Sequence, residues 1–200
     1  MRSEAARVRE LCSGYLEEYL GKVRFCLERL DEAQVWWRPH RAGNSVGNLV
    51  LHVCGNLSQW VLSGLGGEAD SRRRALEFAA DRPMGKRRLA ERLSSVVARC
   101  RRRIALLDEE ALAAPRTIQH RRTDGLGALL HAVEHMSYHT GQIVFVAKQL
   151  RGEGSGIDFY PHLNAPPTTR PPAARRPPRA TRARPFKAGR PASGRRRGRR

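Results

Sequence analysis

Apolar residues recur at three- and four-residue steps in four stretches of the chain, a spacing that places them on one face of a helix. No stretch of useful length alternates apolar and polar residues, so no strand is expected. Four helices of this kind most simply form an all-α four-helix bundle. The predicted helices are Ser3 to Leu30, Asn44 or Ser45 to Gly64, Lys86 to Leu107, and Thr123 or Asp124 to Leu150.

The segments between these helices differ in length and character. Ser71 to Arg82 is polar and is predicted to be irregular, and Asp108 to Arg122 reads as a connection that holds Pro115. Because the link between the second and third helices is long, an up-down-up-down order does not follow from the pattern. Ile157 to Asn164, after a glycine-rich stretch, is predicted to be a short ordered end to the domain.

Charge and proline separate a C-terminal tail from the rest of the chain. Residues 165–200 hold thirteen basic residues, no acid and eight of the twelve prolines, so only +6 of the net charge of +19 belongs to residues 1–164. A segment of this composition cannot bury enough apolar surface to fold. The sequence therefore predicts one domain, 1–164, followed by a disordered basic tail, 165–200.

The tail leaves two interpretations open. Its arginines suit nonspecific, salt-dependent binding to nucleic acid or another polyanion. Alternatively, it is a solvated extension with no fixed partner. Only Phe186 offers an aromatic ring for base stacking.

The remaining composition speaks against a membrane or secreted protein. No apolar run approaches the roughly 20 residues of a membrane-spanning helix, and the segment after Met1 lacks the apolar core of a signal peptide. The four cysteines are widely separated and form no CxxC pair. Reduced, buried thiols in a cytoplasmic protein are the natural expectation.

The fourth predicted helix carries a ladder of histidines at four-residue spacing: His131, His135 and His139. Neighbouring members lie on one helix face and can share a metal ion. The outer two are about 12 Å apart along the axis, too far to join the same ion. One member is therefore expected to be a bystander, and His131 is preferred for that role. A further ligand must come from another helix.

His52, in the middle of the second predicted helix, is the obvious further ligand. Asn48 and Asn56 lie one turn before and after it and form a polar strip on an otherwise apolar helix. Buried polar groups need partners, so the strip implies a site or a hydrogen-bonded network. Gln142 follows His139 by three residues and is expected to orient it. The alternative is that these are ordinary core or surface residues.

Three neutral imidazoles bind Zn²⁺, Ni²⁺, Fe²⁺ or Mn²⁺, and the ligand set does not choose among them. Such a site leaves coordination positions for a small molecule. A bound water becomes a nucleophile near neutral pH, and a bound thiol becomes a thiolate.

Several stretches resemble the DinB/YfiT-like superfamily, with the nearest likeness to a bacterial branch of unassigned function. The resemblance covers about residues 7–164. Its most specific part is the combination of an HxxGN element at His52 with HxxxHxGQI at His135. The residues that carry it are Tyr15-Leu-Glu-Glu-Tyr-Leu, Trp36-Trp37-Arg-Pro, Asn44-Ser-Val-Gly-Asn-Leu, Leu51-His-Val-Cys-Gly-Asn-Leu-Ser-Gln-Trp60 and His135-Met-Ser-Tyr-His139-Thr-Gly-Gln-Ile.

The resemblance implies an up-down-down-up four-helix bundle that holds a divalent metal through His52, His135 and His139. It further implies a metal-dependent thiol S-transferase or hydrolase acting on a low-molecular-weight thiol or another small molecule, and it implies homodimers. The alternatives are a metal-stabilised bundle without turnover, or a binding protein whose basic tail contacts nucleic acid. The Arg/Pro tail is not part of the family pattern.

Overall fold

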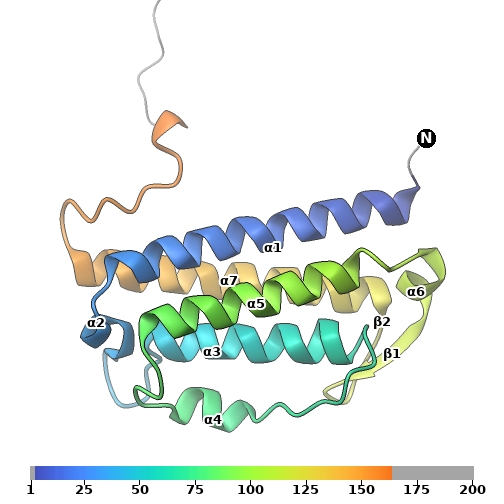
Figure 1. Ribbon diagram of the computed structural model, residues 1–200, viewed down its shortest axis with the longest axis horizontal. Coiled ribbons are helices and arrows are strands. Elements are labelled where there is room, and N and C mark those ends of the chain that lie inside the picture. Colours follow the sequence, from blue (N-terminus) through green and yellow to red (C-terminus); the bar gives the residue numbers. More distant parts are fainter. Residues whose placement is uncertain (1–2, 164–200) are drawn as a thin grey trace, which may run out of the picture. The chain divides into compact units, whose positions relative to one another are not determined.

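The structure, a computed structural model, describes residues 3–163 and is mostly helical (Figure 1). By its internal contacts the chain divides into Met1–Phe159 and Tyr160–Arg200. The predicted tail, 165–200, lies outside the described residues. The elements are α1 (Glu4–Arg29), α2 (Glu32–Trp36), α3 (Val46–Leu57), the π-helix η1 (Ser58–Ser63), α4 (Arg74–Ala79), α5 (Lys86–Ile104), α6 (Glu109–Ala113), β1 (Pro115–Ile118), β2 (Arg121–Asp124), α7 (Gly125–Arg151) and the 3₁₀ turn η2 (Pro161–Leu163).

The four helices expected from the apolar pattern are present, and side-chain caps fix where three of them begin. Ser3, Ser45 and Asp124 each accept a hydrogen bond from a backbone N–H of the first turn of α1, α3 and α7. Such caps satisfy amide donors that have no partner within the helix. The second predicted helix is α3 continued by η1, and its last turns widen to π geometry around the buried Trp60.

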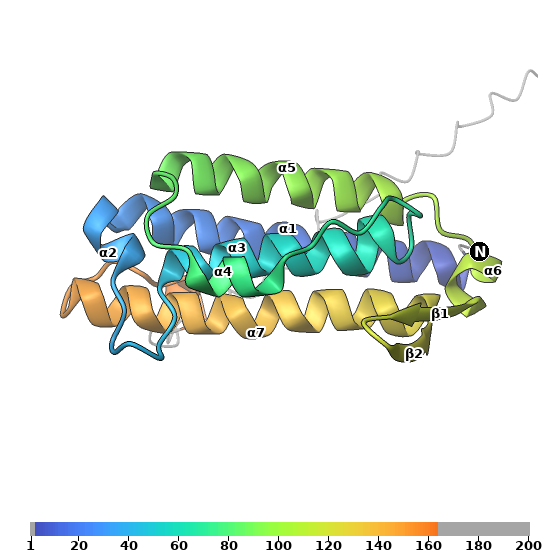
Figure 2. The ribbon, with the colours of Figure 1, turned by 90° about the horizontal axis from the view of Figure 1, so that it is seen from below.

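The long helices lie side by side in the first unit (Figures 1 and 2). α1 and α7 run in one direction, and α3 and α5 run in the other. α1 packs on α5 and α7, and α3 packs on the same two helices from the opposite side. The apolar faces meet in one core that excludes water. Its fully buried side chains include Leu16, Leu27, Leu57, Leu93, Ile104, Leu129, Met136 and Ile143.

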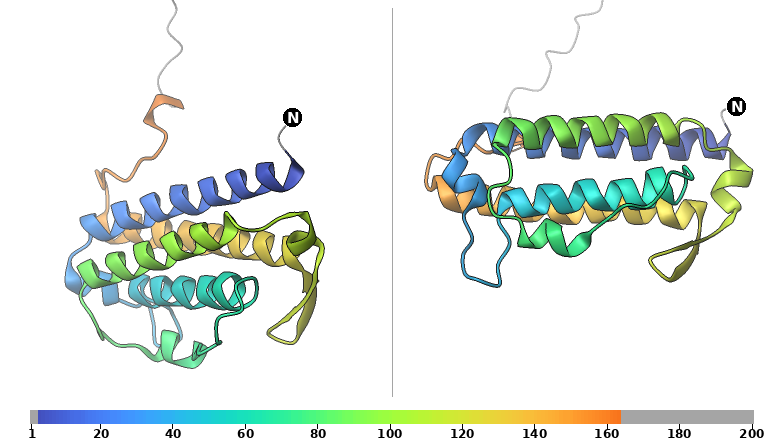
Figure 3. Two further views of the ribbon diagram at one scale, coloured as in Figure 1. Left: turned by 45° about the vertical axis from the view of Figure 1, so that its right-hand side comes forward. Right: turned by 60° about the horizontal axis from the view of Figure 1, so that its bottom comes forward.

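The link between α3 and α5 contains a helix, contrary to the irregular segment predicted for Ser71 to Arg82. α4 lies against the outside of α3 (Figure 3). Asn48 donates through Nδ2 to the carbonyl oxygens of Glu77 and Ala80, both at 2.9 Å. Arg38 donates to the carbonyl of Ala80 at 2.8 Å. These bonds tie the end of the six-residue helix to the core, which explains why it forms without an apolar stripe.

The expectation of no strand is wrong for one short segment. β1 and β2 form an antiparallel hairpin that leads into α7. Gln119 and His120, the two loop residues, both have φ in the left-handed region, at 52° and 62°. Asn-Gly or Gly-rich pairs usually mark such a turn. With four-residue strands and no glycine in the loop, the sequence lacked both of the usual signals for a hairpin.

Candidate metal centre

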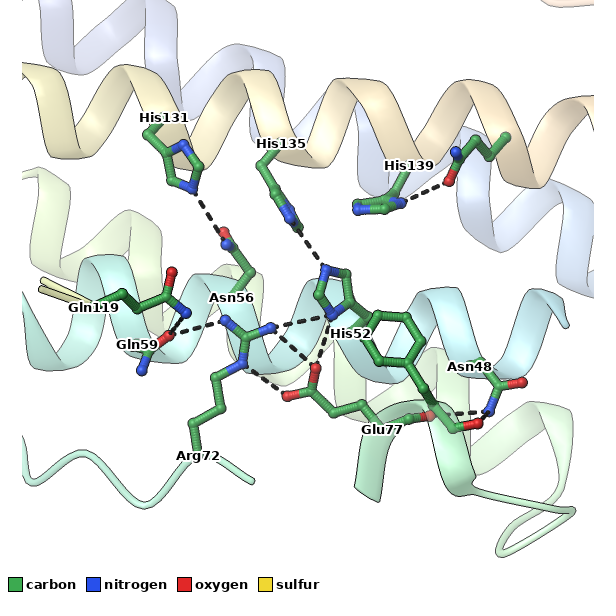
Figure 4. Close-up of polar contacts among 12 residues, drawn as sticks. Asn48, His52, Asn56, Gln59, Arg72, Glu77, Gln119, His131, His135 and His139 are labelled. Carbon is green, nitrogen blue, oxygen red and sulfur yellow. Dashed lines mark hydrogen bonds and ion pairs between the residues drawn. The ribbon is translucent and has the colours of Figure 1, made fainter. Parts of the chain in front are cut away.

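Three histidines from two helices meet in the interior of the first unit. His52 points from α3 toward His135 and His139, which lie on successive turns of α7 (Figure 4). One ring nitrogen of each lies within 4.8 Å of the others, and His52 and His139 are buried. The structure thus brings together the three histidines that the sequence singled out, in an arrangement compatible with metal binding.

The outer nitrogens of two of these rings are occupied. His52 Nδ1 is 2.8 Å from Glu77 Oε2, and His139 Nδ1 is 2.7 Å from Gln142 Oε1. An Nδ1 proton donated to these oxygens leaves Nε2 with a free lone pair on a neutral ring. Both Nε2 atoms are then available as metal ligands. This is the pattern by which outer hydrogen bonds orient histidine ligands in metalloproteins.

The spacing of His52 and His135 fits a shared ion. Their Nε2 atoms are 3.1 Å apart. Two nitrogens that each lie about 2.0–2.1 Å from one ion are separated by roughly 2.9–3.4 Å at tetrahedral or octahedral angles. The Nδ1 atom of His135 is buried and has no hydrogen-bond partner among residues 3–163. The donor set and spacing therefore fit a divalent metal.

Burial keeps the α7 histidines neutral. Desolvation, reinforced by the neighbouring His139 and His52, lowers the pKa of His135 to about 3. Burial also lowers the pKa of His139, although its hydrogen bond to Gln142 acts in the opposite direction. Neutral imidazole is the form that binds metal, so these rings need lose no proton to do so.

A buried ion pair behind His52 is the part of the site that the sequence interpretation missed. Arg72 Nε donates to Glu77 Oε1 at 2.8 Å, and its terminal nitrogen donates to Oε2 at 2.9 Å. The side chains are only 4% and 11% exposed. Burial alone would raise the pKa of Glu77, but hydrogen bonds from His52 and Arg72 outweigh it and lower that pKa. Glu77 therefore stays ionised and holds the Nδ1 proton of His52.

The ion pair approaches α3 closely because Gly55 has no side chain. A Cβ at this position would overlap the Glu77 carboxylate and lie 2.9 Å from Arg72 Nε. Arg72 lies just before α4, and Glu77 lies within that helix. Hydrogen bonds from Asn48 and Arg38 anchor the end of α4. An Arg and a Glu within a polar link look like solvated loop residues in a sequence, and only the packing of the link onto α3 reveals their role.

The three residues expected to support the site have different partners. Gln142 contacts His139 directly. Asn48 hydrogen-bonds to no histidine among residues 3–163. Its Oδ1 accepts from the Ser45 N–H in the capping box of α3, and its Nδ2 donates to the carbonyl of Glu77. Asn56 faces the fourth histidine, with its Nδ2 3.4 Å from His131 Nε2.

His131 lies outside the group of three. Its ring packs against Trp60 with centroids 3.9 Å apart and the ring planes tilted by 41°. Burial lowers the pKa of His131, so it sits as a neutral ring between the aromatic core and Asn56.

A polar chain connects the hairpin to the histidines. Gln119, in the hairpin loop, donates to Gln59 on η1, and Gln59 accepts from Arg72 at 2.9 Å (Figure 4). Arg72 continues the chain through Glu77 to His52. The hairpin and the π-helix thus help to hold the ion pair that orients one of the metal-ligand candidates.

A pocket of about 460 Å³ opens onto the three histidines. It gives a small molecule access to the ligand nitrogens. Besides the histidines, its lining consists of Asn44, Arg74, Phe78, Glu134, Tyr138 and Gln142.

Comparison with protein families identifies the family of this chain. Residues 13–156 match the family described as "Protein of unknown function (DUF1572)". The chain belongs to the DUF1572 family. Its resemblance to the DinB/YfiT-like superfamily is confirmed by this match together with the structural neighbours. No match is found among curated proteins.

Solved structures share the DUF1572 fold at low sequence identity. A conserved protein from Enterococcus faecalis is 18% identical, with a TM-score of 0.63 over 72% of this chain and 97% of its own. A DinB-like protein from Bacillus subtilis is 16% identical, with a TM-score of 0.56 over 72% and 94%. A DinB-like protein from Bacillus cereus is 15% identical, with a TM-score of 0.54 over 68% and 91%. These likenesses establish the fold.

The four cysteines of this DUF1572 protein are free and buried, in agreement with the expectation from their spacing. Burial raises the pKa of Cys26 to about 11 and the pKa values of Cys54 and Cys100 to about 12. Cys54, two residues from His52, does not belong to the group of three potential metal ligands. Among residues 3–163, no helix combines the length and apolar character needed to cross a bilayer.

The lowered histidine pKa values predict that acid destabilises the metal-free protein. Below the ordinary histidine pKa of about 6.5 the unfolded chain takes up protons that folded His135 and His139 do not. Protons therefore favour the unfolded state, and the free energy of unfolding should fall as pH drops from about 6.5 toward 3. His135 alone should contribute about 1 kcal/mol per pH unit through most of this window.

Urea unfolding of chelator-treated protein at pH 7.5, 6 and 5 measures this slope. His135→Ala should flatten the slope, whereas replacement of the exposed His40 should leave it unchanged. An unchanged slope in His135→Ala would contradict the assignment of a neutral, partly buried ring.

Proposed function

We propose that this DUF1572 protein binds a divalent metal ion through His52, His135 and His139. We further propose that it is a metal-dependent enzyme of the thiol S-transferase or hydrolase type. The observation that carries the proposal is the convergence of the three rings, with the outer nitrogens of two of them held by Glu77 and Gln142. Zn²⁺, Ni²⁺, Fe²⁺ and Mn²⁺ all suit three imidazoles.

The surroundings of the histidines support a reactive rather than a purely structural site. A structural zinc site is closed by four protein ligands, whereas a catalytic site has three and an open position. Among residues 3–163 the cluster contains three ligand candidates, and the pocket reaches all of them. A metal held here would supply Lewis acidity, lowering the pKa of a thiol or water that enters the pocket.

The chain's own residues would position the ligands and exclude competing groups. Glu77 holds the Nδ1 proton of His52, and Arg72 holds Glu77 in place. Gln142 fixes the ring of His139. The Phe78 ring packs at a tilt against the His52 ring, with the two centroids 4.6 Å apart.

α1 and α7 run parallel to each other and antiparallel to α3 and α5. This arrangement supports the up-down-down-up four-helix bundle that the family resemblance implies. We extend the proposal to that topology. Homodimers, a cytoplasmic location and a role for the tail in nucleic-acid binding remain predictions.

Metal content tests the proposal. Purified wild-type protein should hold about one divalent ion per chain, and His135→Ala should lose it. His131→Ala should keep it, because His131 lies on the same helix face but outside the group of three. Elemental analysis measures all three proteins. A wild type without metal, or full retention in His135→Ala, would overturn the site.

A thiol and ester substrate screen of the loaded enzyme then separates the two reaction types. Retained metal without turnover of any substrate would support a metal-stabilised bundle instead.

A further inference from the structure

The pocket beside the histidines is lined by an exposed arginine, Arg74, that makes a cation–π contact with Phe78. The guanidinium carbon of Arg74, the first residue of α4, lies 4.8 Å from the centroid of the Phe78 ring. That ring packs in turn on His52. The backbone carbonyl of Phe78 accepts a hydrogen bond from Arg38 at 2.9 Å, which fixes the residue to which Arg74 stacks. Arg74 is therefore held one aromatic ring away from the metal-ligand candidates.

Arg74 has no acidic partner in the part of the chain that the structure describes. The nearby Glu77 is occupied by Arg72 and His52. Glu134, on α7, lines the same pocket, and no ion pair joins it to Arg74 in the described part of the chain. A guanidinium that stacks on a ring keeps its edge donors free, and that edge is suited to a planar carboxylate.

The charge of the loaded site also favours an anion. Three neutral imidazoles leave the two positive charges of a divalent ion uncompensated. The charge of Glu77 is balanced by Arg72. Arg74 and Glu134 form no ion pair, but their opposite charges add up to zero for the pocket as a whole. The pocket would thus carry a net charge close to that of the bare ion, and an occupant with two negative charges would neutralise it.

We propose that the pocket selects small molecules that carry a carboxylate close to their metal-binding atom, with Arg74 as the carboxylate-binding residue. This inference rests on the proposed metal function and names the substrate class for that site. Glu134 lines the same pocket and would disfavour a second carboxylate placed near it. Arg74 thus contributes specificity and leaves ligation to the histidines.

Three small thiols provide matched probes, because thiols bind divalent metals whatever reaction the enzyme performs. 3-Mercaptopropionate carries a carboxylate, 2-mercaptoethanol a hydroxyl and cysteamine an ammonium group. Their affinities are measured by titrating the cobalt-substituted full-length protein and following its visible spectrum. 3-Mercaptopropionate should bind about tenfold or more tightly than 2-mercaptoethanol, and cysteamine should bind most weakly.

The variants assign that preference to one residue. Arg74→Gln should lose most of the preference for the carboxylate while it binds 2-mercaptoethanol as the wild type does. Arg73→Gln is the control, because Arg73 is the adjacent exposed arginine and lines a different pocket. It should behave as the wild type. Glu134→Gln removes the opposing charge and should strengthen 3-mercaptopropionate binding by a few fold.

The outcomes separate the two proposals. Failure of the wild type to take up cobalt would overturn the metal function and this inference with it. Uptake of cobalt with equal affinity for the three thiols, or an unchanged preference in Arg74→Gln, would overturn this inference and leave the metal function standing.

Discussion

Replacement of Glu77 by alanine is expected to destabilise the protein by about 3–5 kcal/mol, because it leaves the Arg72 guanidinium buried without its counter-ion. The Arg72 side chain is only 4% exposed, so its guanidinium depends on Glu77 for charge compensation. The same change removes the acceptor for the Nδ1 proton of His52. Metal affinity should therefore fall as well, by about 10- to 100-fold.

A double variant separates the cost of leaving one charge buried from the cost of losing the other contacts of Arg72 and Glu77. Arg72→Met with Glu77→Met replaces both charges by apolar side chains of similar length. It should cost less stability than Glu77→Ala alone, since no charge is left buried. Glu91→Ala, which breaks the Arg87–Glu91 pair with side chains 90% and 59% exposed, is the surface control. It should cost at most about 1 kcal/mol.

Urea unfolding gives the stabilities, and competition with a chelator gives the metal affinities. A Glu77→Ala protein as stable as Glu91→Ala would show that the Arg72–Glu77 pair is not a buried unit. Unchanged metal affinity in Glu77→Ala would show that His52 is oriented without it.

Gly55→Ala is expected to act on the same network from the other side. The new methyl group would occupy the space of the Glu77 carboxylate and crowd Arg72. Overpacking of this kind costs about 1–3 kcal/mol. Because the displaced carboxylate no longer meets His52, metal affinity should fall about tenfold.

Gly21→Ala on α1 provides a comparison of opposite sign. A Cβ at Gly21 meets nothing within 4 Å. Alanine is the better helix former, so this change should stabilise the protein by up to about 1 kcal/mol. Gly55 also lies within a helix. If helix propensity alone determined the effect, Gly55→Ala would stabilise the protein by the same amount as Gly21→Ala.

The Gly55→Ala/Glu77→Ala double variant locates the strain, because removal of the Glu77 carboxylate makes room for the new methyl group. Its cost should be smaller than the sum of the two single costs. Thermal unfolding and metal affinity of the four proteins give the answer. A stabilised Gly55→Ala protein would mean that the ion pair does not pack against α3.

Spacing along the chain predicts the helices and the histidine ladder of α7, and the family resemblance selects His52, His135 and His139 from the four histidines in contention. His135 and His139 are one helical turn apart, and the polar strip at Asn48, His52 and Asn56 marks a buried face. Gln142 likewise follows from its distance along the helix to His139. These relations are local, and helix geometry translates them directly into proximity.

The ion pair and the hairpin could not be predicted in the same way. Arg72 and Glu77 are charged residues in a link without apolar periodicity, and their burial depends on how that link folds back onto Gly55. The hairpin has strands of four residues and a Gln-His loop that tolerates an unusual backbone. Both features depend on tertiary contacts that override weak local preferences.

The burial of the four cysteines has a chemical consequence for the proposed thiol chemistry. Alkylation requires the thiolate, and with a pKa of about 12 Cys54 and Cys100 remain protonated at neutral pH. A reactive molecule that enters the pocket next to His52 therefore meets no nucleophilic sulfur of the protein itself. Under the proposed function, a reactive substrate would therefore leave the buried thiols of Cys54 and Cys100 unmodified.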